Sequence, residues 1–365
     1  MNGMNGLSRM VRTWLPWFAV LLLGLSVQRL MPPMSAPDEM DHVGRAAQLS
    51  SGSWRLAPTE PPAGLPPDEA RYYRQSGAWI DVGVARFTHA FKPLLLNPAL
   101  RITPAQQVEV AALRWAGQNV FQALPGTGYY FPAVYLPQAA GLAIGRAAGW
   151  SILDSYQLAR GLAWACAMAV LALAWRVARP PLVVTAVLLL PMSLFQAIAP
   201  VIDGLTNALA VLAIALTLRA SRDPHGHGWA ACGALCASVF AVVSSRPQLL
   251  PLLALPLVGA AFARSRGQAV LAGVTALACA AWLVLAIGQT VDLRVVRSTG
   301  ALETARLLLA DPSRLVGMIG NTLSDANQVL FLGQSFIGIL GWLDAPMLRP
   351  FYPVLTGVLV VLVLT

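Results

Sequence analysis

Acids, an imidazole and a guanidinium crowd within two helical turns just after the first apolar run of the chain. The segment reads Ala36-Pro37-Asp38-Glu39-Met40-Asp41-His42-Val43-Gly44-Arg45. Pro37 and Asp38 are typical of a helix start, and Gly52 is typical of its end. On such a helix Asp38 and His42 lie one turn apart on one face.

This pattern suits acid–base chemistry beside a membrane. A carboxylate next to an apolar bundle is easily desolvated, which raises its pKa and favours a general base, so Asp38 and Glu39 are candidates. His42 would orient the base, or share a divalent metal, Mg²⁺ or Mn²⁺, with Asp38. The alternative is a solvated, well-capped helix whose acids favour the N-terminal dipole.

Two later positions add polar groups at the edges of apolar segments. Asp203, with Asn207 one turn on, opens one segment, and Arg246 with Gln248 opens another. Ionisable groups at such edges are functional candidates, and arginine suits phosphate because its fork is bidentate. The alternatives are a plain N-cap for Asp203 and an interfacial snorkelling arginine for Arg246. Acids and arginines on one face could bind a lipid-linked phosphate and activate a hydroxyl.

The composition places these residues in a membrane protein. The chain is 57% hydrophobic and only 11% charged, whereas soluble domains carry about 25% charge. The net charge of +9 comes from arginines scattered between apolar runs, not gathered in a stripe with aromatics, so we expect no nucleic-acid partner. The four cysteines fall inside apolar runs, without the spacing of metal ligands.

The elements that must position these residues are helices of membrane-spanning length, about 20 residues. We expect a single all-α polytopic domain over 1–365, with a first transmembrane helix at 14–31 that is retained and not cleaved as a signal peptide. Six more spanning helices fall within 157–288, near 157–178, 181–199, 203–220, 228–244, 247–264 and 269–288. A further one starts within 352–365, and we expect the protein to continue beyond it.

Arginine pairs set the expected orientation. Positive residues of short loops stay cytoplasmic, which places the N-terminus inside and the segments 32–156 and 289–351 outside a bacterial inner membrane. We interpret 131–149 as a juxtamembrane or re-entrant helix that lies against the bundle, because Pro132, Pro137 and Arg146 make it a poor crossing. The segment 289–351, with Arg294, Arg297, Arg306, Asp311 and Asp325, is expected to close over the outer face and help to choose an acceptor.

Several motifs together resemble one bacterial membrane family, called domain of unknown function 2142. They are Pro37-Asp38-Glu39 with His42, Arg45, Leu49-Ser50 and Gly52; Tyr130-Phe131-Pro132 to Pro137; Asp203-Gly204 with Asn207; Arg246-Pro247; and Phe336-Ile337-Gly338 to Gly341-Trp342-Leu343-Asp344. The resemblance spans nearly the whole chain.

That family is similar to the C-type (GT-C) glycosyltransferase superfamily, which implies a helical bundle with a large first external loop that contains juxtamembrane helices. The resemblance implies transfer of a sugar from a polyprenyl-phosphate carrier to a periplasmic glycan or glycolipid, next to membrane lipids. Asp38 or Glu39 would be the base, with His42 beside it and Asp203 as second acid. The donor phosphate and substrate would be held by Arg45, Arg160, Arg246, Gln248, Tyr130, Asn207, Trp342 and Asp344.

The acids here are adjacent, not spaced as a DxD pair, which leaves metal dependence open. Two other functions fit the same residues. A transporter or flippase of lipid-linked glycans would place ionisable groups deep in several helices, and here they cluster at the helix ends. A non-catalytic assembly protein of envelope polysaccharide synthesis would tolerate loss of the acids.

Overall fold

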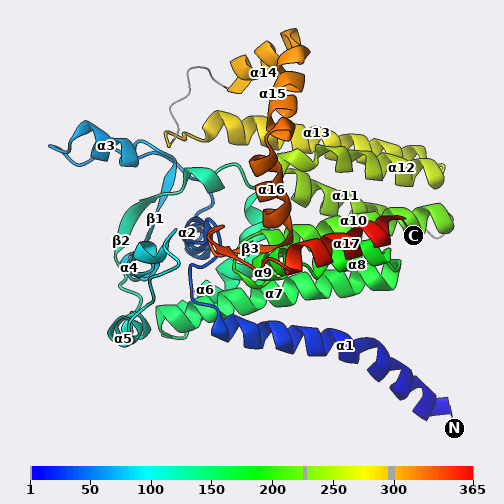
Figure 1. The fold of residues 1–365 in the computed structure, drawn as a ribbon, viewed down its shortest axis with the longest axis horizontal. Coiled ribbons are helices and arrows are strands. Elements are labelled where there is room, and N and C mark those ends of the chain that lie inside the picture. The colour runs from blue at the N-terminus through cyan, green and yellow to red at the C-terminus, as the bar shows by residue number, and fades with distance from the viewer. Residues whose placement is uncertain (1, 225–227, 295–300, 365) are drawn as a thin grey trace.

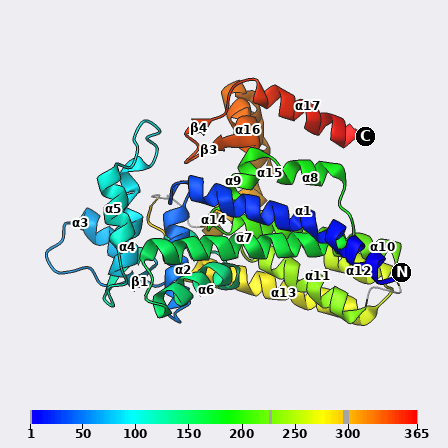
Figure 2. The same ribbon diagram turned by 90° about the horizontal axis from the view of Figure 1, so that it is seen from below.

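The computed structural model describes residues 2–224, 228–294 and 301–364, and its main body is a bundle of helices aligned along one axis (Figures 1 and 2). The bundle helices are α1 (Asn2–Leu30), α7 (Ile152–Val177), α10 (Asp203–Arg222), α11 (Trp229–Val243), α12 (Ala254–Phe262) and α13 (Arg266–Gln289). Their shared core includes Trp164, Leu212 and Val239. α1 belongs to this core, because Trp164 donates its indole N–H to the Leu21 carbonyl (3.0 Å).

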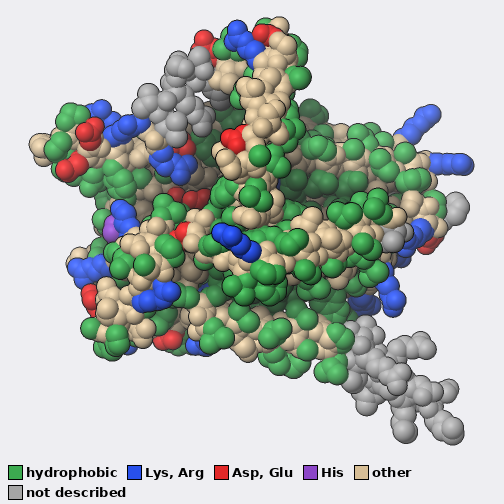
Figure 3. Space-filling model, viewed as in Figure 1, with side chains coloured by type: hydrophobic (Ala, Val, Ile, Leu, Met, Phe, Trp, Pro, Cys, Tyr) green, Lys and Arg blue, Asp and Glu red, His purple; other side chains and the backbone are tan. Residues whose placement is uncertain are grey.

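The bundle surface is apolar, as a lipid environment requires. Three of the described helices, α7, α10 and α13, are long and apolar enough to cross a membrane, and shorter apolar helices lie at 14–30, 229–243, 247–262 and 351–364. On α13 the side chains of Leu277 and Val284 are 72% and 74% exposed. Figure 3 shows many hydrophobic side chains on the face of the bundle that is in view. Water would make this surface costly, so it is a surface for lipid.

Prolines interrupt two segments that the sequence analysis took as continuous spanning helices. The prediction for 181–199 is wrong in this respect: the structure has two short helices, α8 (Leu182–Leu188) and α9 (Pro191–Ile198). Pro191 clashes with the helical conformation of the residue before it, and Leu190 accordingly has ψ 144°. The segment 247–264 likewise starts as the 3-10 helix η4 (Pro247–Leu253), which contains Pro251 and continues into α12.

The segment 131–149 lies along α7 as a short helix. It forms η3 (Pro132–Tyr135) and α6 (Leu136–Ala147), and 12 residues of helix are only about 18 Å long. Glycines allow the close contact, because a Cβ at Gly141 would lie 2.3 Å from the Ala159 Cα and one at Gly145 would lie 2.2 Å from the Ser155 Oγ.

The first long loop folds into a small layer at one end of the bundle. Its helices are α2 (Glu39–Ser50), α3 (Pro67–Tyr73), α4 (Val82–Ala90), η1 (Lys92–Leu94), α5 (Pro104–Ala112) and η2 (Pro125–Thr127). It also contains an antiparallel pair of strands, β1 (Gly77–Asp81) and β2 (Asn119–Ala123), which the all-α expectation missed. Phe87, Ile80 and Leu124 are buried beneath α2. This layer sets α2 against the ends of the bundle helices.

The second long segment mostly leads away from α2. It forms α14 (Ala301–Ala310), α15 (Pro312–Ser324), α16 (Ala326–Gly338), the short pair β3 (Ile339–Leu340) and β4 (Ala345–Pro346), and α17 (Phe351–Leu364). Figure 1 shows α14 and α15 pointing away from the bundle, so they do not close over α2 as expected. Arg306, Asp311 and Asp325 lie on or beside these helices. Arg297 lies outside the described residues.

Candidate functional site: a charged cluster at the start of helix α2

Glu39 fixes the entry into α2. It is fully buried, and its carboxylate accepts the backbone N–H groups of Met34 (3.0 Å) and Ala36 (2.9 Å). Tyr156 of α7 donates its hydroxyl to the same carboxylate. Three donors therefore occupy Glu39, and no part of it reaches solvent. The structure gives Glu39 an anchoring position, not the accessible position that a general base needs.

Asp38 and Asp41 are the two acids of α2 that stay accessible. Asp38 has a left-handed backbone (φ 55°), is exposed, and makes no side-chain hydrogen bond that caps α2, so the alternative of a well-capped helix does not hold at this residue. Asp41 is half-buried. Burial raises the pKa of Asp41 from 3.8 to about 6, and the nearby Asp38 carboxylate adds to the shift.

An ion pair joins the start of α10 to the start of η4, close to the beginning of α2. Arg246, which precedes η4, forms a salt bridge with Asp203 at the start of α10. Its guanidinium also lies over the ring of Tyr130, 5.2 Å from the centroid. The two side chains keep 19% and 23% of their surfaces exposed, so the pair borders solvent. The sequence named these three residues separately, and the fold brings them together.

His42 is enclosed behind this pair. Its ring is 4% exposed, stacks on Tyr130 with 5.9 Å between centroids, and its Nδ1 lies 2.7 Å from the Tyr135 hydroxyl. Burial, helped by Arg246, lowers the pKa of His42 to about 3, so the imidazole is neutral. Burial also raises the pKa of Tyr135 well above its usual value, so its hydroxyl stays protonated beside the His42 Nδ1.

The expected sharing of a metal between Asp38 and His42 does not fit this geometry. The His42 ring is buried, with its Nδ1 beside the Tyr135 hydroxyl and its face on Tyr130, whereas Asp38 is exposed. Within 14–224, 228–294 and 303–364, no group of three His, Cys, Asp or Glu side chains is placed to hold a metal ion. We therefore derive no step through Mg²⁺ or Mn²⁺.

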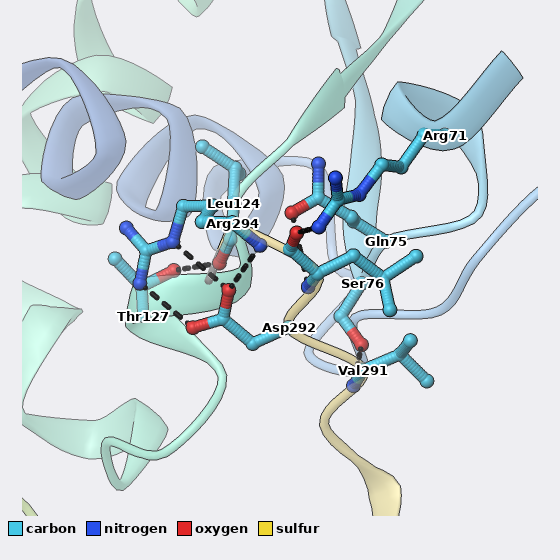
Figure 4. A network of polar contacts seen from close by, with 9 residues as sticks. Arg71, Gln75, Ser76, Leu124, Thr127, Val291, Asp292 and Arg294 are labelled. Atoms are coloured by element: carbon cyan, nitrogen blue, oxygen red, sulfur yellow. Dashed lines mark hydrogen bonds and ion pairs between the residues drawn. The ribbon is translucent and has the colours of Figure 1, made fainter. Parts of the chain in front are cut away.

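A short extended segment after α13, residues 289–294, crosses the first loop and is called the strap. Ser76 donates its N–H to the Val291 carbonyl (2.9 Å) and accepts the Val291 N–H on its Oγ (2.9 Å), while Leu293 donates its N–H to the Gln75 side chain (3.3 Å) (Figure 4). The strap thus pins the end of a bundle helix to the loop that carries α2.

The strap delivers one more ion pair. Arg294 donates to both carboxylate oxygens of Asp292 (3.0 and 2.9 Å), as Figure 4 shows. Its guanidinium lies over Gly126, where a Cβ would come within 3.0 Å of it. Arg294 lowers the pKa of Asp41 and Asp292 raises it, so both groups act on the accessible acid of α2.

The charged cluster therefore consists of Asp38, Asp41, Asp203, Asp292, Arg246 and Arg294. Four carboxylates face two guanidiniums, and the two acids of α2 are the ones without an ion-pair partner among the described residues. Burial first, and the neighbouring Asp38 carboxylate second, raise the pKa of Asp41 to about 6, within about one unit of neutral pH. A carboxylate with a pKa near the operating pH is mostly ionised and still has a high proton affinity, which is what a general base needs.

The structure places the remaining candidates away from the cluster. Arg160 is fully buried and donates to the carbonyls of Ile198, Gln28 and Met31, which ties α7 to α1 and α9. Arg45 is buried one turn beyond Asp41 on α2 and donates to the Gln48 side chain, with no ion pair to the cluster among the described residues.

The last four candidates have different surroundings. Asn207 lines two apolar cavities, of about 280 and 420 Å³, beside α8 and α9. Gln248 is exposed next to Arg246. Trp342 donates its indole N–H to the Met34 carbonyl (3.1 Å), and Asp344 accepts the Trp342 N–H within the same turn (3.0 Å). This turn supports the Met34 backbone that Glu39 also holds.

Sequence reasoning mentioned Asp41 only as a neighbour, named Arg294 only as part of a closing loop, and missed Tyr135. Asp41 carries no signal of its own, because its pKa depends on burial in the folded protein and on the charges of Arg294 and Asp292, about 250 residues later in the chain. Tyr135 sits in the motif 130–137, and its signal was a tyrosine beside a predicted membrane surface.

The family model described as predicted membrane protein (DUF2142) matches residues 21–365. The chain belongs to this family. Membership confirms the resemblance seen in the motifs, and it agrees with the apolar helices of the fold: this is a membrane protein whose bundle contacts lipid. No curated protein and no solved structure matches the chain.

Proposed function

We propose that this DUF2142 protein is a membrane glycosyltransferase of the GT-C type, with Asp41 as the general base. The observation that carries the proposal is the half-buried Asp41, whose pKa is about 6 in a cluster with two unpaired carboxylates. In the proposed step Asp41 removes the proton of an acceptor hydroxyl while its oxygen attacks the anomeric carbon. The bond from that carbon to the carrier phosphate breaks, and the phosphate keeps the electron pair.

The other residues of the cluster have supporting parts in this proposal. Asp38 keeps the proton affinity of Asp41 high, and Arg246 is the proposed contact for the donor phosphate, because its guanidinium borders solvent. The apolar cavity of about 420 Å³ that includes Asn207, one turn beyond Asp203, is proposed to receive part of the polyprenyl chain. The proposal gives a structural role to four other candidates, which stabilise the fold around the cluster: Glu39, Arg160, Trp342 and Asp344.

The proposed orientation places the cluster on the periplasmic side of a bacterial inner membrane. Arginines stand in the last turns of α7 and α10 (Arg176, Arg219 and Arg222) and at the junction of α12 and α13. These are the ends of the helices away from α2 (Figure 1). The positive-inside rule assigns that end to the cytoplasm.

The test replaces the base in cells that depend on one copy of the full-length protein. Asp41→Asn is compared with Asp68→Asn, a change of an exposed aspartate in α3 of the same loop, with membrane insertion verified for both. Loss of a general base costs about 10²–10⁴ in rate, so a specific sugar should disappear from the envelope glycans only in Asp41→Asn. Unchanged glycans in that variant would refute the proposal and favour an assembly role.

A further inference from the structure

A small cavity with a positive lining lies where α2 meets the end of α13 and the start of the strap. Its volume is about 30 Å³. Two arginines, Arg45 and Arg55, line it together with the end of α13 and the turn at Gly128. The lining contains no acidic side chain. A cavity needs about 10–15 Å³ to hold one water, so this one has room for about two waters or one small ion.

Arg45 is an incompletely satisfied buried charge. It is 2% exposed, and its NH1 donates to Gln48, but its Nε has no hydrogen-bond partner among the described residues. Burial lowers the pKa of Arg45 to about 10, which leaves the guanidinium charged at neutral pH. A buried charge of this kind is costly unless an opposite charge compensates it.

The protein supplies only part of that compensation. None of the three ion pairs among the described residues includes Arg45 or Arg55, and no carboxylate contributes to the shift of the Arg45 pKa. The C-terminal end of α13, at Ala286 and Gln289, lines the cavity. A helix terminus offers at most about half a negative charge, so two guanidiniums at one cavity keep a positive surplus.

We propose that this cavity binds one small inorganic anion of the size of chloride, between Arg45 and Arg55. The buried guanidinium provides the free Nε donor, Arg55 provides a second charge from the exposed rim, and the hydroxyl side chain of Thr290 is part of the wall. The volume is too small for a sugar or a lipid headgroup. The anion joins α2 to the end of α13, and its role is structural and independent of the proposed transfer.

The experiment follows thermal unfolding of the purified full chain in detergent. Tryptophan fluorescence gives Tm in gluconate buffer as sodium chloride replaces sodium gluconate at constant ionic strength. A ligand that binds only the native state raises Tm in a saturable way. The wild type should show that rise, Arg45→Met should lose it, and Arg55→Gln should need several-fold more chloride. Arg74→Gln, a change of an exposed arginine in the same loop, should respond as the wild type does.

Further variants and ligands distinguish this site from the charged cluster and from a site for a larger anion. Asp41→Asn should keep the chloride response, because the cluster is a different site, and that result holds whether or not the glycosyltransferase proposal survives. A wild-type Tm that does not depend on chloride would overturn the anion site, as would an equal response in Arg45→Met. Stabilisation by inorganic phosphate or phosphatidylglycerol micelles, with none by chloride, would also overturn it, since it would point to a larger ligand.

Discussion

Asp41→Asn should make the protein more stable at alkaline pH, although we propose that it abolishes transfer. The native carboxyl group has a pKa of about 6, about 2 units above the usual 3.8. Each unit is worth about 1.4 kcal/mol. The native state binds this proton more tightly than the unfolded state does. Ionisation of Asp41 therefore lowers the free energy of unfolding as pH rises from about 4 to about 6. Above about pH 6 the free energy of unfolding stays lower by the full amount.

The magnitude follows from the same numbers. Ionised Asp41 costs the native state about 3 kcal/mol, and about 2 kcal/mol after allowance for the partial exposure of its side chain. Asparagine has nearly the same shape and no charge. An unfolding entropy of about 2.1 cal/mol/K per residue over 365 residues converts about 2 kcal/mol into a rise in Tm of roughly 2–3 °C for Asp41→Asn at pH 8. Near pH 4 both proteins carry a neutral side chain at this position, and their Tm values should differ little.

The assay is thermal unfolding of the purified protein in detergent at about pH 4 and pH 8. Asp68→Asn, an exposed aspartate of the same loop, is the matched control and should shift Tm equally at both values. If Asp41→Asn changes Tm by the same amount at pH 4 and pH 8, the surroundings do not raise the pKa of Asp41 to about 6. The argument for Asp41 as the general base would then fail.

Three further changes test the framework and the tuning of the site. Glu39→Gln should lower the free energy of unfolding by about 2–4 kcal/mol, because two backbone N–H groups and one tyrosine hydroxyl lose a charged acceptor; a Tm within 1 °C of the wild type would contradict this. Gly141→Val places a Cβ 2.3 Å from the backbone of α7 and should cost about 1–3 kcal/mol or more, whereas Gly233→Ala, with open space around it, should be neutral or slightly stabilising in the same unfolding assay. Arg294→Gln removes a charge that lowers the pKa of Asp41, so the acidic limb of the pH–activity profile should move to higher pH. The control Arg314→Gln, at an exposed arginine of α15, should leave that limb in place. Equal profiles for Arg294→Gln and the wild type would refute the coupling.

Local pattern was sufficient for the elements that depend on nearby residues. The helix at α2 follows from Pro37 and Gly52, and the observed helix runs from Glu39 to Ser50. Apolar runs predicted most bundle helices within a few residues, because length and hydrophobicity are properties of the segment itself. Pro191 also indicates a helix break in the sequence. The prediction of a continuous helix at 181–199 was wrong because it followed hydropathy and ignored the backbone restriction that proline places on the residue before it.

The roles of individual charged residues depended on partners far away in the chain. Glu39 was expected to be a base, and Tyr156 together with two backbone N–H groups makes it an anchor. Arg160 was expected to hold phosphate, and it binds carbonyls at the ends of α1 and α9 instead. The strands β1 and β2 were missed, since their pairing joins residues about 40 positions apart.

The sequence by itself determined that this is a helical membrane protein of the DUF2142 family, and it singled out Asp203, Arg246 and Tyr130 as polar groups at helix and loop edges. Those conclusions rest on composition and motifs, which need no knowledge of packing. Only the tertiary structure decided which acid is accessible with a raised pKa, because desolvation is set by every element that packs around a carboxylate. The charges of Asp292 and Arg294 on the strap also act on the pKa of Asp41, and only the folded chain brings them near α2.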